Sequence, residues 1–270
     1  MKDLYEQLKE LRLPGITEVL PSRLTQAREQ ALPHQDWLSL LLQDELERRY
    51  RQGLQRRLQE ATFEGDQTLE NYDLTLYPPQ LQQLIKELQK GNYLKEFHHI
   101  LVMGPTGTGK SHLAQGLGHQ VCRQGKKVKF IRAKKLFEDF EASRILQPNV
   151  SCSKRLLSFL QPHLLIIDDF GLNSLTPHQA EDFYELIAEK HQKSSFIMTS
   201  NRPVEAWVEL FPDPVMGNAA LDRLAHCAYH VILEGESHRR RTHPHLQFSK
   251  ASPASEEDQK KSKNQNPQSS

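Results

Sequence analysis

Eight consecutive residues near the middle of the chain have the types and spacing of a loop that binds phosphate groups. They are Gly104, Pro105, Thr106, Gly107, Thr108, Gly109, Lys110 and Ser111. The glycines permit a tight backbone that points its N–H groups at a phosphate, and a helix that begins there adds its positive end. Lys110 would reach the β- and γ-phosphates, and the Ser111 hydroxyl would bind Mg²⁺. The alternative is a plain glycine turn, but the apolar run before the loop and the helical stretch after it favour nucleotide binding.

An acidic pair follows a second apolar run. Residues 164–167 are all Leu or Ile and lead directly into Asp168 and Asp169, a pattern typical of a strand that is buried on both faces. Asp168 would hold Mg²⁺, and Asp169 would orient or deprotonate the attacking water. The alternative is a strand end with two exposed aspartates, and the phosphate loop makes that interpretation less favourable.

A third candidate strand, residues 195–200, has an apolar centre and a polar tip and leads into Asn201. Taken alone, an Asn after a strand is more often a turn residue. In open α/β sheets, however, the ligand lies outside the carboxyl ends of the strands. After a phosphate loop and an acidic strand, we therefore expect the Asn201 amide to contact the γ-phosphate or the water.

The strands and helices that position these residues are predicted from the spacing of apolar residues and from the Pro and Gly residues that separate them. Strands are expected near residues 100, 128, 164, 195 and 230, with helices between them. This pattern predicts an α/β fold with a central parallel sheet flanked by helices, and the 270 residues leave room for a small helical domain in addition.

The first 65 residues read as that small helical domain. Leucines at helical spacing predict a helix that Pro14 and Gly15 stop, followed by a second helix. A long amphipathic helix follows, with its apolar positions four apart at Leu46, Tyr50, Leu54 and Leu58. We therefore expect a small helical domain over 1–65, a nucleotide-binding core over 66–248 and a disordered polar tail over 249–270.

The composition indicates where in the cell the protein is located more clearly than which reaction it catalyses. The three cysteines lie far apart and lack metal-ligand spacing, which is typical of reduced thiols. The amino terminus does not read as a signal peptide, and no apolar stretch approaches the length of a membrane span. We therefore expect a cytoplasmic protein with no membrane partner.

Six motifs together resemble the AAA+ ATPases of the IstB and DnaC group, specifically the IstB-type helpers of insertion-sequence transposases. The matching segments are residues 11–16 (LRLPGI), 104–111 (GPTGTGKS), 164–171 (LLIIDDFG), 199–203 (TSNRP), 221–224 (LDRL) and 234–237 (EGES). The phosphate loop is shared with many NTPases, whereas the last two motifs and the first are more specific. The resemblance covers nearly the whole chain except the tail.

The resemblance implies an AAA+ P-loop core that binds ATP with Mg²⁺. Asn201 matches the first sensor position, Arg223 matches the arginine finger that one subunit offers to its neighbour, and Arg239 falls near the second sensor. Asp169 stands where many AAA+ proteins have Glu. The resemblance also places the adenine pocket near residues 71–76.

Nucleic-acid binding must come from local basic patches, because the net charge is only +1. One candidate is the arginine-rich stretch 48–57, for which a solvated helix face is an equal alternative, and a second is the lysine-rich stretch 126–135. The resemblance adds the region 134–160, with Arg144, Lys154 and Arg155 as residues to test. Aromatic residues are not interleaved with these charges, so we expect salt-sensitive contacts to the phosphates of double-stranded DNA.

The function that the resemblance implies is an ATP-hydrolysing helper of transposition, which assembles as a homo-oligomer on DNA and recruits or activates its cognate transposase. The nearest alternative is a replicative helicase loader of the DnaC type. A small-molecule P-loop kinase would need an acceptor pocket and a lid that carries arginine. A fourth possibility is a nucleotide-gated DNA-binding scaffold, in which Asp169 is too short to activate water.

Overall fold

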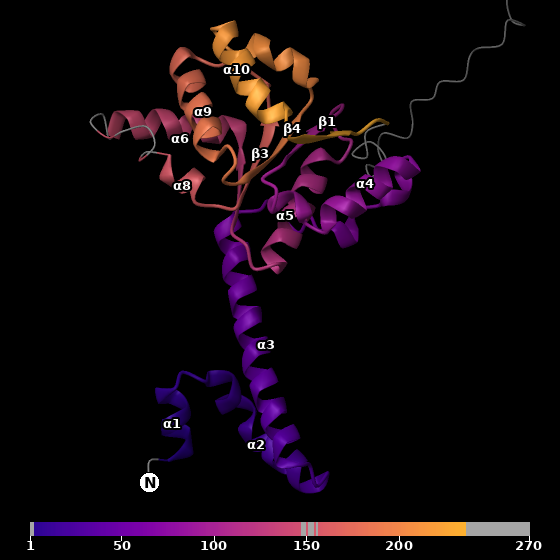
Figure 1. The fold of residues 1–270 in the computed structure, drawn as a ribbon, viewed down its shortest axis with the longest axis vertical. Coiled ribbons are helices and arrows are strands. Elements are labelled where there is room, and N and C mark those ends of the chain that lie inside the picture. The colour runs from indigo at the N-terminus through magenta and orange to yellow at the C-terminus, as the bar shows by residue number, and fades with distance from the viewer. Residues whose placement is uncertain (1–2, 147–149, 151–153, 155, 236–270) are drawn as a thin grey trace, which may run out of the picture.

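The computed structural model describes residues 3–146, 150, 154 and 156–235 (Figure 1). Within this part of the chain, five strands form one parallel sheet in the order β2-β3-β4-β1-β5. The strands are β1 (His99–Met103), β2 (Val128–Arg132), β3 (Leu164–Phe170), β4 (Ser195–Ser200) and β5 (Ala228–Ile232). The predicted parallel sheet is confirmed, and its strands lie where the apolar runs placed them.

Helices cover both faces of the sheet (Figure 1). One face carries α4 (Pro79–Gln89) and α5 (Lys110–Arg123), and the other carries α6 (Ala133–Leu146), α8 (Leu157–Leu160), α9 (Pro177–Lys190) and α10 (Pro214–Ala225). Short 3₁₀ turns complete the core at η1 (Leu69–Asn71), η2 (Leu74–Leu76), η3 (Asn92–Leu94) and η4 (Val204–Leu210).

Side chains along each strand point alternately to the two faces of the sheet, which produces two apolar layers. On β1, Ile100 and Val102 pack into the layer under α5, whereas Leu101 and Met103 pack into the layer under α9. Successive side chains of a strand point to opposite faces of the sheet, so a strand between two helical layers must be apolar throughout. The continuous apolar runs of the sequence have this cause.

The amino-terminal helices form an arm that extends away from the sheet (Figure 1). They are α1 (Leu4–Glu10), α2 (Pro14–Glu29) and α3 (His34–Ala61), and α2 packs along the distal half of α3. The two predicted helices are confirmed, since α1 ends at Glu10, ahead of Pro14, and a second helix follows, of which Pro14 is the first residue. A proline is well tolerated in the first turn of a helix, where its missing N–H would have no partner in any case.

A buried carboxylate at Glu45 joins α2 to α3. Its Oε2 accepts hydrogen bonds from the backbone amides of Gly15, at 2.6 Å, and Ile16, at 3.2 Å, and its Oε1 accepts from Arg49 at 2.7 Å. A Cβ on Gly15 would lie 2.7 Å from Glu45 Oε2, so this close approach requires glycine. The Leu-Pro-Gly motif at 13–15 therefore serves the contact between two helices.

The base of α3 belongs to the core. Ala61 is buried, the Arg57 side chain donates to the carbonyl of Cys122, and the Thr62 hydroxyl donates to the carbonyl of Phe130. By contrast Leu46 and Tyr50, which were expected on the apolar face of α3, are 67% and 50% exposed. The helix changes partner along its length, so no single face is buried throughout.

Several expectations concern residues that the structure does not describe, among them Arg155, Arg239 and the polar tail at 249–270. The domain division at residues 65 and 248 stays a prediction. Among the described residues, none of the helices combines the length and the apolar character needed to cross a membrane.

Candidate nucleotide-binding site

The phosphate loop lies between β1 and α5, at the carboxyl edge of the sheet. Gly104 and Gly109 have φ angles of +150° and +86°, which glycine adopts without strain. A Cβ on Gly104 would lie 2.2 Å from the carbonyl oxygen of Leu233, so the backbone leaves no room for a side chain there. Helix α5 begins at Lys110 without a side-chain cap on its first amides, which suits an anion at that end.

Contacts within the loop hold it in shape. The ammonium of Lys110 donates to the carbonyl of Pro105 at 2.8 Å, and the hydroxyl of Thr108 donates to the same carbonyl at 2.9 Å. Lys110 is only 5% exposed. The loop is therefore folded around its own lysine before any phosphate arrives.

Two tyrosines that sequence reasoning missed support the loop from behind. The hydroxyl of Tyr77 donates to the carbonyl of Thr108 at 2.9 Å, and the hydroxyl of Tyr72 donates to Tyr77 at 2.7 Å. The two rings are stacked with centroids 5.6 Å apart, and both lie against Gly109. The segment that was expected near the adenine thus carries side chains that support the phosphate loop. The only sequence signal for this role is the pair of tyrosines before Pro78.

The acidic pair ends β3 as predicted, and its first member is buried. Asp168 is 3% exposed, and burial raises its pKa, while hydrogen bonds from the hydroxyls of Thr199 and Ser111 act in the opposite direction. Thr199 donates to Asp168 Oδ1 at 2.5 Å. The structure therefore brings together Ser111 and Asp168, the two residues expected to bind the metal.

Asp169 leaves the strand at a bulge. Its φ of +56° lies in the left-handed region, and the strand register shifts between Ile167 and Phe170. Its backbone amide donates to the Thr199 hydroxyl at 3.0 Å, which holds this conformation. A non-glycine residue in this region costs about 1–3 kcal/mol, and such strain concentrates at functional sites. The bulge turns Asp169 into the same cavity as the phosphate loop.

That cavity has a volume of about 450 Å³. It is lined by Gln67, Thr106, Gly107, Gly109, Lys110, Ser111, His112, Asp169, Leu172 and Asn201. Five of the eight predicted loop residues, the second aspartate and Asn201 therefore line the same cavity, whereas Gly104, Pro105 and Thr108 do not line it. Gln67 and His112 were not expected, and they are held by Gln115 at 2.7 Å and by the carbonyl of Thr68 at 2.8 Å.

The oxygen atoms of this site suit a Mg²⁺ ion that binds together with a nucleotide. Ser111 and Asp168 offer adjacent oxygen ligands, which Mg²⁺ prefers. Within the described ranges, no three His, Cys, Asp or Glu side chains gather into a metal cluster. The remaining ligands would therefore be phosphate oxygens and water, as is usual for this ion.

Arg223 does not reach this cavity from its own chain. It lies on α10, where its guanidinium stacks 4.9 Å from the ring centroid of Tyr184 on α9. The cavity lining does not include either residue. Arg223 therefore does not form part of the cavity of its own chain in this structure.

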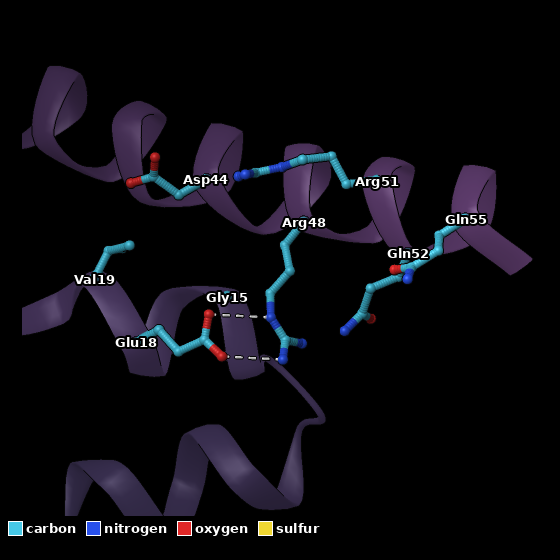
Figure 2. Close-up of a pocket in the computed structure, with 8 residues that line it drawn as sticks. All are labelled: Gly15, Glu18, Val19, Asp44, Arg48, Arg51, Gln52 and Gln55. Carbon is cyan, nitrogen blue, oxygen red and sulfur yellow. Dashed lines mark hydrogen bonds and ion pairs between the residues drawn. The ribbon is translucent and has the colours of Figure 1, made fainter. Parts of the chain in front are cut away.

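The arginine-rich stretch of α3 is engaged in contacts within the arm and with the core. Arg48 forms an ion pair with Glu18 at 3.0 Å, beside a cavity of about 260 Å³, and Figure 2 shows Arg51 extending toward Asp44. Ion pairs or carbonyls likewise hold Arg49, Arg56 and Arg57. The side chains of Arg49 and Arg56 nevertheless stay 55% and 78% exposed, and exposed ion pairs are weak, so these contacts do not decide between a solvated helix face and a DNA-binding one.

Arg144 is also engaged. Its guanidinium bonds to both carboxylate oxygens of the buried Asp182, at 2.8 and 2.9 Å, and to Glu181 at 3.0 Å. A DNA phosphate would have to compete with two carboxylates for this side chain. Arg144 therefore joins α6 to α9 and is a poor candidate for DNA contact.

A parallel sheet with a phosphate loop after β1, an acidic pair after β3 and a polar tip after β4 defines the core of a P-loop NTPase of the AAA+ type. The comparisons with known proteins then place the chain more narrowly. Residues 6–245 match the family of IstB-like ATP binding proteins, and the chain belongs to that family.

Relatives share most of its length. An insertion-sequence protein of Mycobacterium tuberculosis, described by its name as ATP-binding, is 34% identical over 89% of this chain and 95% of its own length. A Pseudomonas aeruginosa protein, named for ATP binding and for insertion sequence IS21, is 30% identical over 88% of this chain and 89% of its own. A solved structure of DnaI covers 65% of this chain and 93% of that one, with a TM-score of 0.53 and 15% identity. The last similarity concerns the fold alone.

Proposed function

We propose that the chain binds ATP with Mg²⁺ and hydrolyses it in the cavity between the phosphate loop and the acidic pair. The observation that carries this proposal is the Thr199 hydroxyl, which accepts from the amide of Asp169 and donates to Asp168. One side chain thus fixes a buried carboxylate beside Ser111 and a second carboxylate in the open cavity. Two carboxylates with different surroundings suit two tasks, metal binding and activation of water.

Each residue of the cavity has a role in this proposal. The loop amides and Lys110 bind the β- and γ-phosphates, and Ser111 and Asp168 hold the metal, which neutralises phosphate charge when bound. Asp169 orients the attacking water and accepts its proton, and the Asn201 amide positions the same water or the γ-phosphate. Arg223 of a neighbouring copy stabilises the negative charge that develops on the transferred group.

The test of hydrolysis compares wild type with Asp169→Ala. We expect wild-type protein to release phosphate from ATP, and the variant to bind ATP with similar affinity but to release at least about a hundredfold less phosphate. Equal turnover by the two proteins would exclude Asp169 as the residue that activates water. Absence of turnover in wild type under all conditions would favour the nucleotide-gated scaffold.

The broader proposal is an ATP-dependent helper of insertion-sequence transposition, which assembles as a homo-oligomer on double-stranded DNA and recruits or activates its transposase. It is supported by family membership and by relatives whose names place them in insertion sequences. Because Arg223 is remote from its own cavity, hydrolysis would depend on assembly. In this proposal residues 1–65 contact DNA or the partner.

A helicase loader of the DnaC type is the second candidate, because it would share the same core. The two functions separate in parallel assays, which measure DNA joining by a purified insertion-sequence transposase and retention of a purified replicative helicase. Stimulation of DNA joining by the transposase, with no retention of helicase, is the expected result. Helicase loading without an effect on the transposase would reverse the assignment.

A further inference from the structure

A cation–π contact fixes the one arginine for which we propose a role outside its own subunit. The guanidinium carbon of Arg223 lies 4.9 Å from the ring centroid of Tyr184. Arg223 is half-buried on α10, between the buried residues Leu221 and Leu224. Among the described residues, Arg223 forms no ion pair with a carboxylate, and the aromatic ring is its principal partner there.

We propose that Tyr184 is a positioning residue, whose ring face holds the Arg223 guanidinium in the direction from which it enters the nucleotide site of a neighbouring copy. This inference rests on the proposed hydrolysis of ATP across a subunit interface. An arginine side chain has many rotamers, and each one that is excluded before assembly lowers the cost of ordering it at the interface.

The ring of Tyr184 is suited to this task because its helix is firmly anchored. The preceding residue, Phe183, is buried and stacks on Phe170 with ring centroids 5.1 Å apart. Phe170 in turn contacts Trp207 at 4.8 Å and directly follows the acidic pair on β3. One aromatic cluster therefore connects the strand that carries Asp169 to the residue that supports Arg223.

The contact uses the ring and not the hydroxyl. In the described part of the chain, the Tyr184 hydroxyl makes no hydrogen bond, whereas the ring lies under the guanidinium. Tyr184→Phe should therefore preserve the positioning of Arg223, and Tyr184→Leu should weaken it. A cation–π contact at a half-buried site changes the population of the favoured arginine orientation by about two- to tenfold. We therefore expect turnover to change by a similar factor.

The experiment mixes two inactive variants of the full chain. Arg223→Ala has an intact cavity but no arginine to donate, and Asp169→Ala has the arginine but cannot activate water. Mixing them should restore turnover, because the second variant supplies Arg223 to the first. The supplying subunit is then changed to Asp169→Ala/Tyr184→Leu or to Asp169→Ala/Tyr184→Phe.

We expect the leucine double variant to restore about two- to tenfold less turnover than Asp169→Ala, and the phenylalanine double variant to restore as much. The KM for ATP should be unchanged, because the cavity belongs to the other subunit. Equal restoration by the leucine and phenylalanine variants would overturn the role of Tyr184. If Asp169→Ala itself restores nothing, the arginine does not act between subunits, and that result refutes the proposed function together with this inference.

A control separates positioning from folding. Thermal unfolding of each supplying variant should match that of Asp169→Ala within about 2 °C, and light scattering should give the same particle mass with ATP. If the leucine variant unfolds, Tyr184→Met fills a similar volume without an aromatic face and replaces it in the same mixture. Full restoration by the methionine variant would also overturn the proposal.

Discussion

Thr199 on β4 donates a hydrogen bond of 2.5 Å to Oδ1 of Asp168 on β3, and both residues are buried. The same hydroxyl accepts from the amide of Asp169, where the backbone turns into the left-handed region. A neutral side chain on the neighbouring strand thus sets the positions of both carboxylates. The following expectations depend on this arrangement and on the contacts around it.

Replacing Thr199 with Val removes the hydroxyl and keeps the shape. Asp168 and the amide of Asp169 both lose a partner, so we expect turnover or Mg²⁺ affinity to fall by about 10- to 100-fold. Stability should fall by about 1–3 kcal/mol, because buried polar groups are left unsatisfied. Thr199→Ser keeps the hydroxyl and should retain most of the activity. Steady-state hydrolysis over a series of Mg²⁺ concentrations measures both variants, and an unchanged Mg²⁺ dependence in Thr199→Val would refute the role of this bond.

Asp168→Asn should stabilise the protein in the absence of nucleotide and metal. Burial raises the pKa of Asp168, so the folded state holds a proton more tightly than the unfolded state does. The favourable contribution is complete below the ordinary pKa of about 4 and is lost as the pH rises through the folded value. At neutral pH the charged carboxylate therefore costs stability, and the Asn variant should melt a few degrees higher, with the difference closing near pH 4. Thermal unfolding from pH 4 to pH 8 tests this directly.

The same variant should lose the stabilisation that ATP and Mg²⁺ give together. Wild-type protein gains melting temperature from the pair of ligands by mass action, whereas Asp168→Asn lacks a metal ligand and should gain much less. If the Asn variant melts lower than wild type at pH 7 without ligands, the buried carboxylate is not a source of strain.

Tyr77→Phe removes the hydroxyl that donates to the carbonyl of Thr108 in the phosphate loop. We expect nucleotide affinity to weaken by about two- to tenfold, the cost of one hydrogen bond that shapes the loop. Tyr72→Phe is the matched control, since the Tyr72 hydroxyl donates its hydrogen bond to Tyr77, whereas the Tyr77 hydroxyl donates to the loop. Titration with a fluorescent ATP analogue compares the two variants, and a larger effect at Tyr72 would contradict the assignment.

Arg144→Ala should affect stability and leave DNA binding nearly intact. The guanidinium neutralises the buried Asp182, so its removal should cost about 2–4 kcal/mol. Arg144→Ala/Asp182→Ala leaves no orphaned charge and should recover part of that loss. Below the melting temperature of the variant, DNA affinity at several salt concentrations should stay within about twofold of wild type. A clearly smaller slope of affinity against salt would show that Arg144 contacts phosphate after all.

The sequence predicted the parts of the site whose residue types are dictated by phosphate chemistry. The loop from Gly104 to Ser111 and the pair at Asp168 are recognisable because each residue type meets the ligand directly. Thr199 and Tyr77 were not predicted, because their roles arise from contacts between segments about 30 residues apart in the chain. Short-range patterns carry no information about which buried hydroxyl faces which carboxylate.

The arm shows the same limit in its backbone. The break between two helices at Pro14 was predicted, but the pattern did not show why Gly15 follows it, because the Gly15 amide donates to Glu45, 30 residues later. The buried face of α3 also changes along its length, from the contact with α2 to the contact with the core. A prediction from apolar periodicity assumes that one face of a helix is buried along its whole length, so it cannot reproduce this change of buried face.

The most direct test of the account is ATP hydrolysis by the purified full chain, with and without duplex DNA, with particle mass followed by light scattering in the same samples. We expect DNA and ATP together to raise both turnover and mass, and Arg223→Ala to abolish turnover while ATP binding persists. Full turnover by a particle that stays monomeric, with or without DNA, would contradict it.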